Sequence, residues 1–154
     1  MSEPKSVLFV CLGNICRSPS AEGVFAHYLA ERGLSQAITV DSAGTGAWHI
    51  GELPDPRSRQ AASRRGYRLD SRARQVQPDD FERFDLIVAM DRDNLKTLRA
   101  MNRGGSARVC LLSDFLPPGG SVDVPDPYYG GPQGFDLVLD MLESACDGLL
   151  AALG

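Results

Sequence analysis

The stretch of residues 7–19 restricts the possible folds of this chain more than any other. Its first four residues, VLFV, are all apolar, and three of them are β-branched or aromatic, which is typical of a buried strand. A Gly-Asn pair follows at 13–14, and both residue types tolerate the backbone conformations of a tight loop. Ser18 is a good N-cap residue and Pro19 a good first residue of a helix. The stretch therefore predicts a strand, a short loop and the start of a helix.

A loop between a strand and a helix N-terminus is a natural site for an anion. Its amides can point inward, and the first helical turn adds unpaired N–H groups and the positive end of the dipole. Thiols in such places have pKa values lowered from about 8.5 to roughly 3.5–7.5, so we expect Cys11 to be ionised. Arg17 adds a planar guanidinium that matches two oxygens of a phosphate. The predicted phosphate-binding residues are Leu12, Gly13, Asn14, Ile15, Cys16, Arg17 and Ser18.

This loop resembles that of the low-molecular-weight protein tyrosine phosphatases, which reads C-x-G-N-x-C-R-S. Residues 11–18 match the pattern without a gap, and the resemblance extends from Val7 into the final helix. It implies that Cys11 attacks phosphorus and forms a phosphocysteine. It also implies that Arg17 and the loop amides bind the phosphoryl group and stabilise the transition state. Neither a cofactor nor a metal is expected, since no Cys-x2-Cys pair is present.

Two further segments match the family and supply candidate supporting residues. A Ser-Ala-Gly-Thr segment at 42–45 would be an ordinary turn on its own, but the resemblance implies that Ser42 hydrogen-bonds Asn14 and supports the loop. An apolar strand is expected at 86–90, directly before Asp91. Asp91 would cap the next helix at the edge of the sheet where the loop lies. Capping alone explains this residue, so we count it only as a supporting candidate.

A long loop rich in proline and glycine is expected over residues 113–134, and loops of this length are usually functional or disordered. It contains Asp126 in an Asp-Pro-Tyr-Tyr sequence, which could be a plain turn. The resemblance implies instead that Asp126 is the general acid that protonates the leaving group and then takes a proton from water. It also implies that the Ser18 hydroxyl donates to the sulfur of Cys11.

Aromatic residues in two loops predict the walls of a cleft. Trp48 could cover the core or could flank a flat aromatic group, and the resemblance favours the second interpretation. Tyr128 or Tyr129 would stand opposite. Because the sulfur lies at the bottom of the loop, a phenyl phosphate reaches it and phosphoserine falls short. Tyrosine-phosphorylated proteins or peptides are the expected partners, and the sequence leaves open whether a cognate kinase phosphorylates the two tyrosines.

The four cysteines help to separate alternative functions. Cys16 has two possible roles. It could serve simply as a packing residue, or it could trap oxidised Cys11 as a disulfide, and the resemblance favours the second role. Arsenate reductases share this scaffold but need resolving cysteines on a mobile segment, whereas Cys110 and Cys146 fit the core of a strand and of a helix. A non-catalytic phosphoprotein-binding module would have no use for the thiol or for Asp126. The phosphatase is therefore the favoured prediction.

Length and charge limit the remaining possibilities. The 154 residues suit a single phosphatase domain, 1–154, which we expect to be a monomer. A net charge of −4 without a block of basic residues argues against nucleic acid. No apolar run approaches membrane-spanning length, so no membrane partner is expected. The N-terminus does not read as a signal peptide, so we expect a cytoplasmic protein and leave open export without a cleavable signal.

The predicted strands and helices alternate along the chain. Strands are expected at 7–10, 38–40, 86–90 and 108–112, and helices at 19–32, 55–66, 91–101 and 135–153. This order predicts an α/β three-layer sandwich, in which helices cover both faces of a four-stranded parallel sheet. The phosphate-binding loop would follow the first strand. All the candidate polar residues would then lie at the carboxyl ends of the strands, where ligands bind in such sheets.

Overall fold

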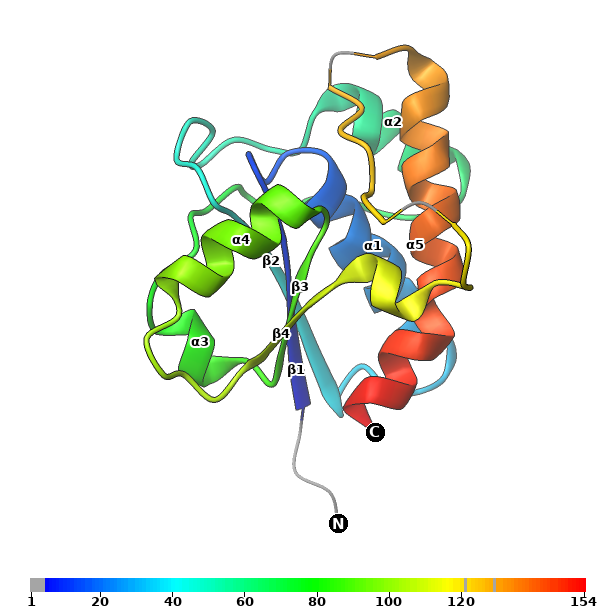
Figure 1. Cartoon of the computed structure of the whole chain (residues 1–154). Coiled ribbons are helices and arrows are strands. Elements are labelled where there is room, and N and C mark those ends of the chain that lie inside the picture. Colours follow the sequence, from blue (N-terminus) through cyan, green and yellow to red (C-terminus); the bar gives the residue numbers. More distant parts are fainter. Residues whose placement is uncertain (1–4, 121, 129) are drawn as a thin grey trace.

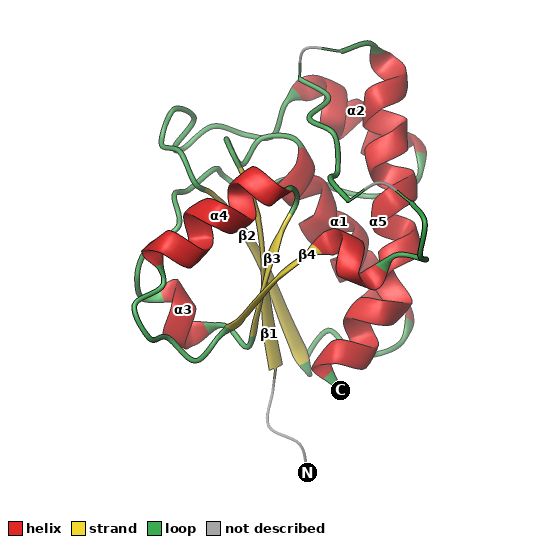
Figure 2. Ribbon diagram, in the orientation of Figure 1, coloured by secondary structure: helices red, strands yellow, loops and turns green. Residues whose placement is uncertain are grey.

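A four-stranded parallel sheet forms the centre of the computed structural model, with helices on both of its faces (Figures 1 and 2). The structure describes residues 5–120, 122–128 and 130–154, so that Tyr129, a predicted wall of the cleft, lies outside the described residues. The fold class predicted from the sequence is confirmed. The strands, in the sheet order β2-β1-β3-β4, are β1 (Lys5–Cys11), β2 (Ile38–Gly44), β3 (Leu86–Ala89) and β4 (Arg108–Leu111).

Helices divide between the two faces of the sheet, as Figure 1 shows. Residues of α1, α2 and α5 share one apolar cluster, and residues of α3 and α4 share the other. In the part of the chain that the structure describes, no helix combines the length and apolar character needed to cross a membrane. The helices are α1 (Arg17–Glu31), α2 (Pro56–Arg64), α3 (Asp80–Arg83), α4 (Arg92–Met101), the 3-10 helix η1 (Leu112–Phe115) and α5 (Pro132–Leu153).

The side chains of β1 alternate between the two apolar clusters. Val7, Phe9 and Cys11 belong to the cluster with α1 and α5, whereas Leu8 and Val10 belong to the cluster with α3 and α4. All five side chains are buried, because helices cover both faces of the sheet. This explains why the strand reads as a continuous apolar run rather than an alternating one.

The position of β1 in the sheet determines where a ligand can bind. β1 pairs with β2 on one side and with β3 on the other, and all these pairings are parallel. The chain therefore leaves the carboxyl end of β1 at the point where the order of the strands reverses. Crevices in open parallel sheets form at such points. The loop predicted from residues 11–18 opens here.

Several predicted boundaries are wrong. The second strand, expected at 38–40, extends to Gly44, so Ser42 lies in the strand and not in a turn. The first helix begins at Arg17 instead of Pro19, and its N-cap Cys16 makes no side-chain capping bond, so Ser18 is not the cap. The helix begins two residues before the predicted start, so Ser18 lies inside its first turn. The loop predicted at 113–134 is shorter, since η1 occupies its start and α5 begins at Pro132. Proline suits the first position of a helix, where its missing N–H has no cost.

Gly44, the last residue of β2, allows a close approach to the loop after β1. A Cβ atom at this position would lie 2.8 Å from the carbonyl oxygen of Leu12 and 3.1 Å from the carbonyl carbon of Gly13. Both neighbours are backbone atoms, which cannot move as a flexible side chain can. The absence of a side chain at Gly44 is therefore a requirement of the packing.

We predict that Gly44→Ala lowers the free energy of unfolding by about 1–3 kcal/mol, because overpacking forces the backbone to shift. Gly120→Ala is the matched control, since its Cβ would lie 3.7 Å from the nearest atom, an ordinary contact. The control should stay within about 0.5 kcal/mol of the wild type. Urea unfolding followed by circular dichroism measures both, and equal stability of the two variants would contradict the assigned role of Gly44.

Candidate active site

Asn14 holds the loop of residues 12–16 from behind. It is the only non-glycine residue in the described segments with a positive φ, 57°. Its side-chain Nδ2 donates to the Oγ atoms of Ser18 and Ser42, at 2.8 and 3.0 Å, and its Oδ1 accepts from the backbone N–H of Arg74 at 3.0 Å. The buried amide thus joins the loop to α1, to β2 and to the segment that follows α2. The two serines lie where the resemblance implies, but neither lines the cleft.

Cys11, the last residue of β1, lies at the bottom of the loop. Its Sγ is 3.0 Å from the Oγ of Ser18, and both residues are buried. The Ser18 oxygen already accepts from the amide of Asn14, so its own hydrogen can be donated to the sulfur or to the carbonyl of Ala43, at 3.4 Å. The shorter contact favours the sulfur. A donated hydrogen bond of this kind stabilises a thiolate.

Arg17 places a buried guanidinium beside this sulfur. Its Nη1 donates to Oδ2 of Asp91 at 2.6 Å and to the carbonyl oxygen of Val124 at 2.9 Å. Burial acts to lower the pKa of Arg17, but the neighbouring Cys11 and Asp91 outweigh it and leave this pKa above its ordinary value. The guanidinium therefore stays charged. Asp91 also caps α4, because its Oδ1 accepts from the N–H of Asn94 at 2.7 Å.

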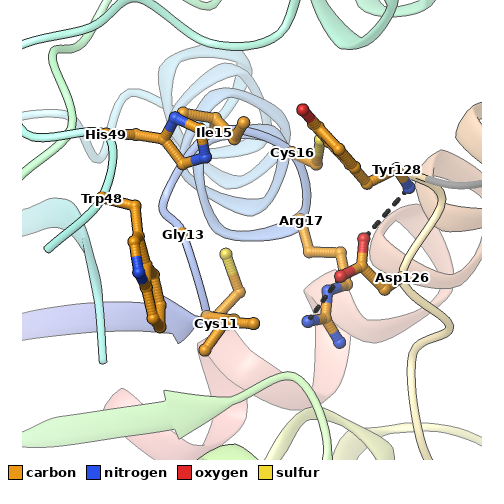
Figure 3. A pocket seen from close by; sticks show the side chains of 10 residues that line it. Cys11, Gly13, Ile15, Cys16, Arg17, Trp48, His49, Asp126 and Tyr128 are labelled. Atoms are coloured by element: carbon orange, nitrogen blue, oxygen red, sulfur yellow. Dashed lines mark hydrogen bonds and ion pairs between the residues drawn. The ribbon is translucent and has the colours of Figure 1, made fainter. Parts of the chain in front are cut away.

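Asp126 faces Arg17 across the site. Its Oδ2 is 3.7 Å from Nη2 of Arg17, and its Oδ1 accepts from the N–H of Tyr128 at 3.0 Å (Figure 3). The side chain of Asp126 is 39% exposed, so the carboxylate can reach a molecule that enters from solvent. The predicted general acid and the predicted nucleophile thus lie on two sides of one guanidinium.

A cleft of about 400 Å³ opens above these groups (Figure 3). Trp48 and Tyr128 lie at opposite sides of its mouth, and 71% and 37% of their surfaces are exposed. The cleft brings together the predicted nucleophile, guanidinium, acid and aromatic walls. Its lining residues are Cys11, Leu12, Gly13, Ile15, Cys16, Arg17, Trp48, His49, Asp126 and Tyr128.

Two residues of the site were not predicted. His49 lines the cleft, where its ring packs against Gly13 and its Nδ1 is 2.9 Å from Oε2 of Glu52. The guanidinium of Arg57 lies 5.3 Å from the ring centre of Tyr128 and supports this wall. Adjacency to Trp48 was the one signal for His49. No local pattern indicates that an arginine of α2 meets a tyrosine so distant in sequence.

The comparisons with known proteins agree with this geometry. The sequence model described as "Low molecular weight phosphotyrosine protein phosphatase" matches residues 6–154. The chain is 48% identical over 150 residues to a putative low molecular weight protein-tyrosine-phosphatase of Synechocystis, covering 96% of each chain. It is 50% identical over 151 residues to a low molecular weight protein-tyrosine-phosphatase of Streptomyces coelicolor, covering 96% of this chain and 92% of that one.

Solved structures give the same result. A protein tyrosine phosphatase from Entamoeba histolytica with Hepes in its active site superposes with a TM-score of 0.93 and 43% identity, covering 97% of this chain and 96% of that one. YfkJ from Bacillus subtilis gives a TM-score of 0.91 and 42% identity, covering 98% and 95%. The fold and the site thus define a cysteine-dependent phosphatase. The chain belongs to the low molecular weight phosphotyrosine protein phosphatase family, and neither alternative function is favoured.

The other three thiols are buried, and of these Cys16 lines the cleft. Burial raises the pKa of Cys16 to about 12, that of Cys110 to about 11 and that of Cys146 to about 12. A raised thiol pKa means that the neutral form persists at pH 7, and neutral thiols are poor nucleophiles. Cys11 is buried as well, but it is the thiol that lies beside the charged Arg17 and within hydrogen-bond distance of the Ser18 hydroxyl.

We predict that iodoacetamide at pH 7 modifies Cys11 at least about 100-fold faster than the other three cysteines. Peptide mass spectrometry after timed quenching measures the site and the rate. Inorganic phosphate should protect Cys11 by filling the cleft, and Cys11→Ser should take up no label on the same timescale. Labelling of Cys16 at a rate similar to that of Cys11 would show that the assignment of the reactive thiol is wrong.

Proposed function

We propose that this protein hydrolyses phosphotyrosine, and aryl phosphate monoesters generally, through a phosphocysteine intermediate on Cys11. The observation that supports this most directly is the convergence of the sulfur, the buried guanidinium of Arg17 and the carboxylate of Asp126 on one cleft. A tetrahedral dianion in this cleft would meet a nucleophile below, amides around it and an acid at its outer side. Tyrosine-phosphorylated proteins or peptides are the substrates that this arrangement suits.

In the first step, the Cys11 thiolate attacks phosphorus in line with the leaving oxygen. The P–S bond forms as the P–O bond to the aryl group breaks, and Asp126 gives its proton to the departing oxygen. The amides of residues 12–18 and the guanidinium of Arg17 hold the three non-bridging oxygens. Their contribution is greatest in the transition state, because the charge then spreads over these oxygens and the donors need no reorganisation.

In the second step, water replaces the sulfur. Asp126, now a carboxylate, takes a proton from the attacking water, and the P–S bond breaks to release inorganic phosphate. The Ser18 hydroxyl, 3.0 Å from the sulfur, stabilises the departing thiolate of Cys11. The aspartate is protonated again at the end of the cycle, so no group outside the chain is consumed apart from water.

The aromatic walls account for the choice of an aryl substrate. The rings of Trp48 and Tyr128 lie at opposite sides of the mouth, where a phenyl group would pass between them (Figure 3). Ile15 and Leu12 add apolar surface to the same cleft. A phenyl ring gains favourable contacts with these groups that a short alkyl chain does not make.

Other expectations from the sequence stay predictions: one domain over 1–154, a monomer and a cytoplasmic location. A disulfide between Cys11 and Cys16 also stays a prediction. It would form when the thiol of Cys16 condenses with a sulfenic acid on Cys11 and releases water. Because burial raises the pKa of Cys16 to about 12, we expect this step to be slow at neutral pH.

The proposed function is tested by hydrolysis of para-nitrophenyl phosphate with excess EDTA present. The wild type should be equally active with and without the chelator. Cys11→Ser should lose activity about 10³-fold or more, because a serine hydroxyl is not ionised at neutral pH. The variant should still bind inorganic phosphate in isothermal titration calorimetry. Turnover by Cys11→Ser, or loss of wild-type activity on chelation, would contradict the mechanism.

The role of Asp126 predicts a dependence on the leaving group. Asp126→Asn should lower kcat/KM, which reports only the steps up to release of the phenol, about 100-fold or more for phenyl phosphate, whose phenolate is a poor leaving group that needs a proton. The loss should be much smaller for para-nitrophenyl phosphate, whose leaving group departs as the anion. Steady-state assays of both substrates measure the ratio. If the variant lowers kcat/KM by the same factor for both substrates, Asp126 is not the acid.

A further inference from the structure

The segment of residues 122–128, which we call the acid segment, has no helix or strand to fix it (Figure 1). Its position depends on individual contacts with the rest of the fold. Val124 provides one of them, since its side chain is buried and its N–H donates to the carbonyl oxygen of Met90 at 2.8 Å. Its carbonyl oxygen accepts from Arg17. Val124 is thus an anchor two residues before Asp126.

A second contact lies one residue earlier. The backbone N–H of Arg92 donates to Oδ1 of Asp123 at 2.9 Å, and its Nη2 donates to Oδ2 at 3.2 Å. Its Nε lies 3.3 and 3.4 Å from the two carboxylate oxygens. Hydrogen bonding by Arg92 also lowers the pKa of Asp123, so the carboxylate is ionised at neutral pH. Both groups of Arg92, backbone and side chain, therefore bind the same carboxylate.

Two consecutive residues at the start of α4 support the acid segment, Asp91 through Arg17, which binds the carbonyl oxygen of Val124, and Arg92 directly. Asp91 binds Arg17 inside the site, at 2.6 Å, and Arg92 binds Asp123 outside it. A segment held only at Val124 could pivot about that residue. A second anchor one residue away restricts the pivot and hence the path of Asp126. A misplacement of 1 Å at a reacting group can cost about 100-fold in rate.

We propose that Arg92 is a positioning residue, whose ion pair with Asp123 fixes the acid segment so that Asp126 reaches the leaving oxygen. The inference rests on the proposed function of Asp126. The Arg92 side chain is 69% exposed and that of Asp123 is 36% exposed. Exposed pairs are weak and screened by salt, so the effect on rate is a few-fold, not a loss of activity.

The test compares Arg92→Ala and Asp123→Ala with the wild type on two substrates. Each variant should lower kcat/KM for phenyl phosphate about threefold to tenfold, which matches the weakness of an exposed pair. kcat/KM for para-nitrophenyl phosphate should not change, because this leaving group needs no proton and kcat/KM does not include the second step, in which Asp126 acts as a base. The double variant should lose no more than either single variant, because both remove the same interaction. Thermal unfolding shows whether the variants are folded.

Arg99→Ala is the matched control, because Arg99 is an exposed arginine in the last turn of the same helix. It should leave both rates unchanged. An equal fall in kcat/KM for both substrates with Arg92→Ala, no fall at all, or the same result for Arg99→Ala would overturn the positioning role. Asp126→Asn in the same series distinguishes the two proposals. If only Asp126→Asn shows a dependence on the leaving group, the role of Arg92 is overturned and the acid role of Asp126 stands. If neither Asp126→Asn nor Arg92→Ala shows this dependence, the acid role is overturned as well.

Discussion

The fold of the anion site depends on the side-chain amide of Asn14. A left-handed backbone conformation costs a non-glycine residue about 1–2 kcal/mol, and asparagine tolerates it better than most. Three hydrogen bonds, from its amide to Ser18 and Ser42 and from the N–H of Arg74 to its oxygen, offset this cost at about 1 kcal/mol each. The loop is therefore held in its binding conformation before any anion arrives. Preorganisation of this kind makes backbone amides effective in a transition state.

Arg17 shows how one buried charge can serve the fold and the chemistry together. An unpaired guanidinium at this depth would be costly, and Asp91, Val124 and the sulfur of Cys11 together compensate its charge and its donors. The donors that face Asp126 point into the cleft, where an incoming phosphate would meet them. The same side chain thus stabilises the packing of three segments and presents charge to the substrate.

Local patterns determined how much of this structure could be predicted. The strand–loop–helix unit of residues 7–19 and the cap at Asp91 follow from short-range preferences, so both were recognised in the sequence. Ser18 was misassigned as a cap, because capping propensity does not reveal that its hydroxyl faces the sulfur of Cys11. Contacts such as Arg17 with Val124, 107 residues apart, could not be predicted, since no local pattern specifies which distant backbone group meets a side chain.

The alternation of side chains along β1 has a consequence for insertions and deletions. Cys11 lies on the same face as Val7 and Phe9, toward α1 and its arginine. Because side chains in a strand repeat every two residues, removing or adding one residue before Cys11 would turn the sulfur toward the opposite helical layer. The number of residues in this strand before Cys11 can therefore change only by an even number if the sulfur is to keep its side of the sheet. Grafting the loop onto another parallel sheet would therefore require more than the loop itself. The last residue of the receiving strand would also need to place its side chain on the same face of the sheet as the helix that follows the loop.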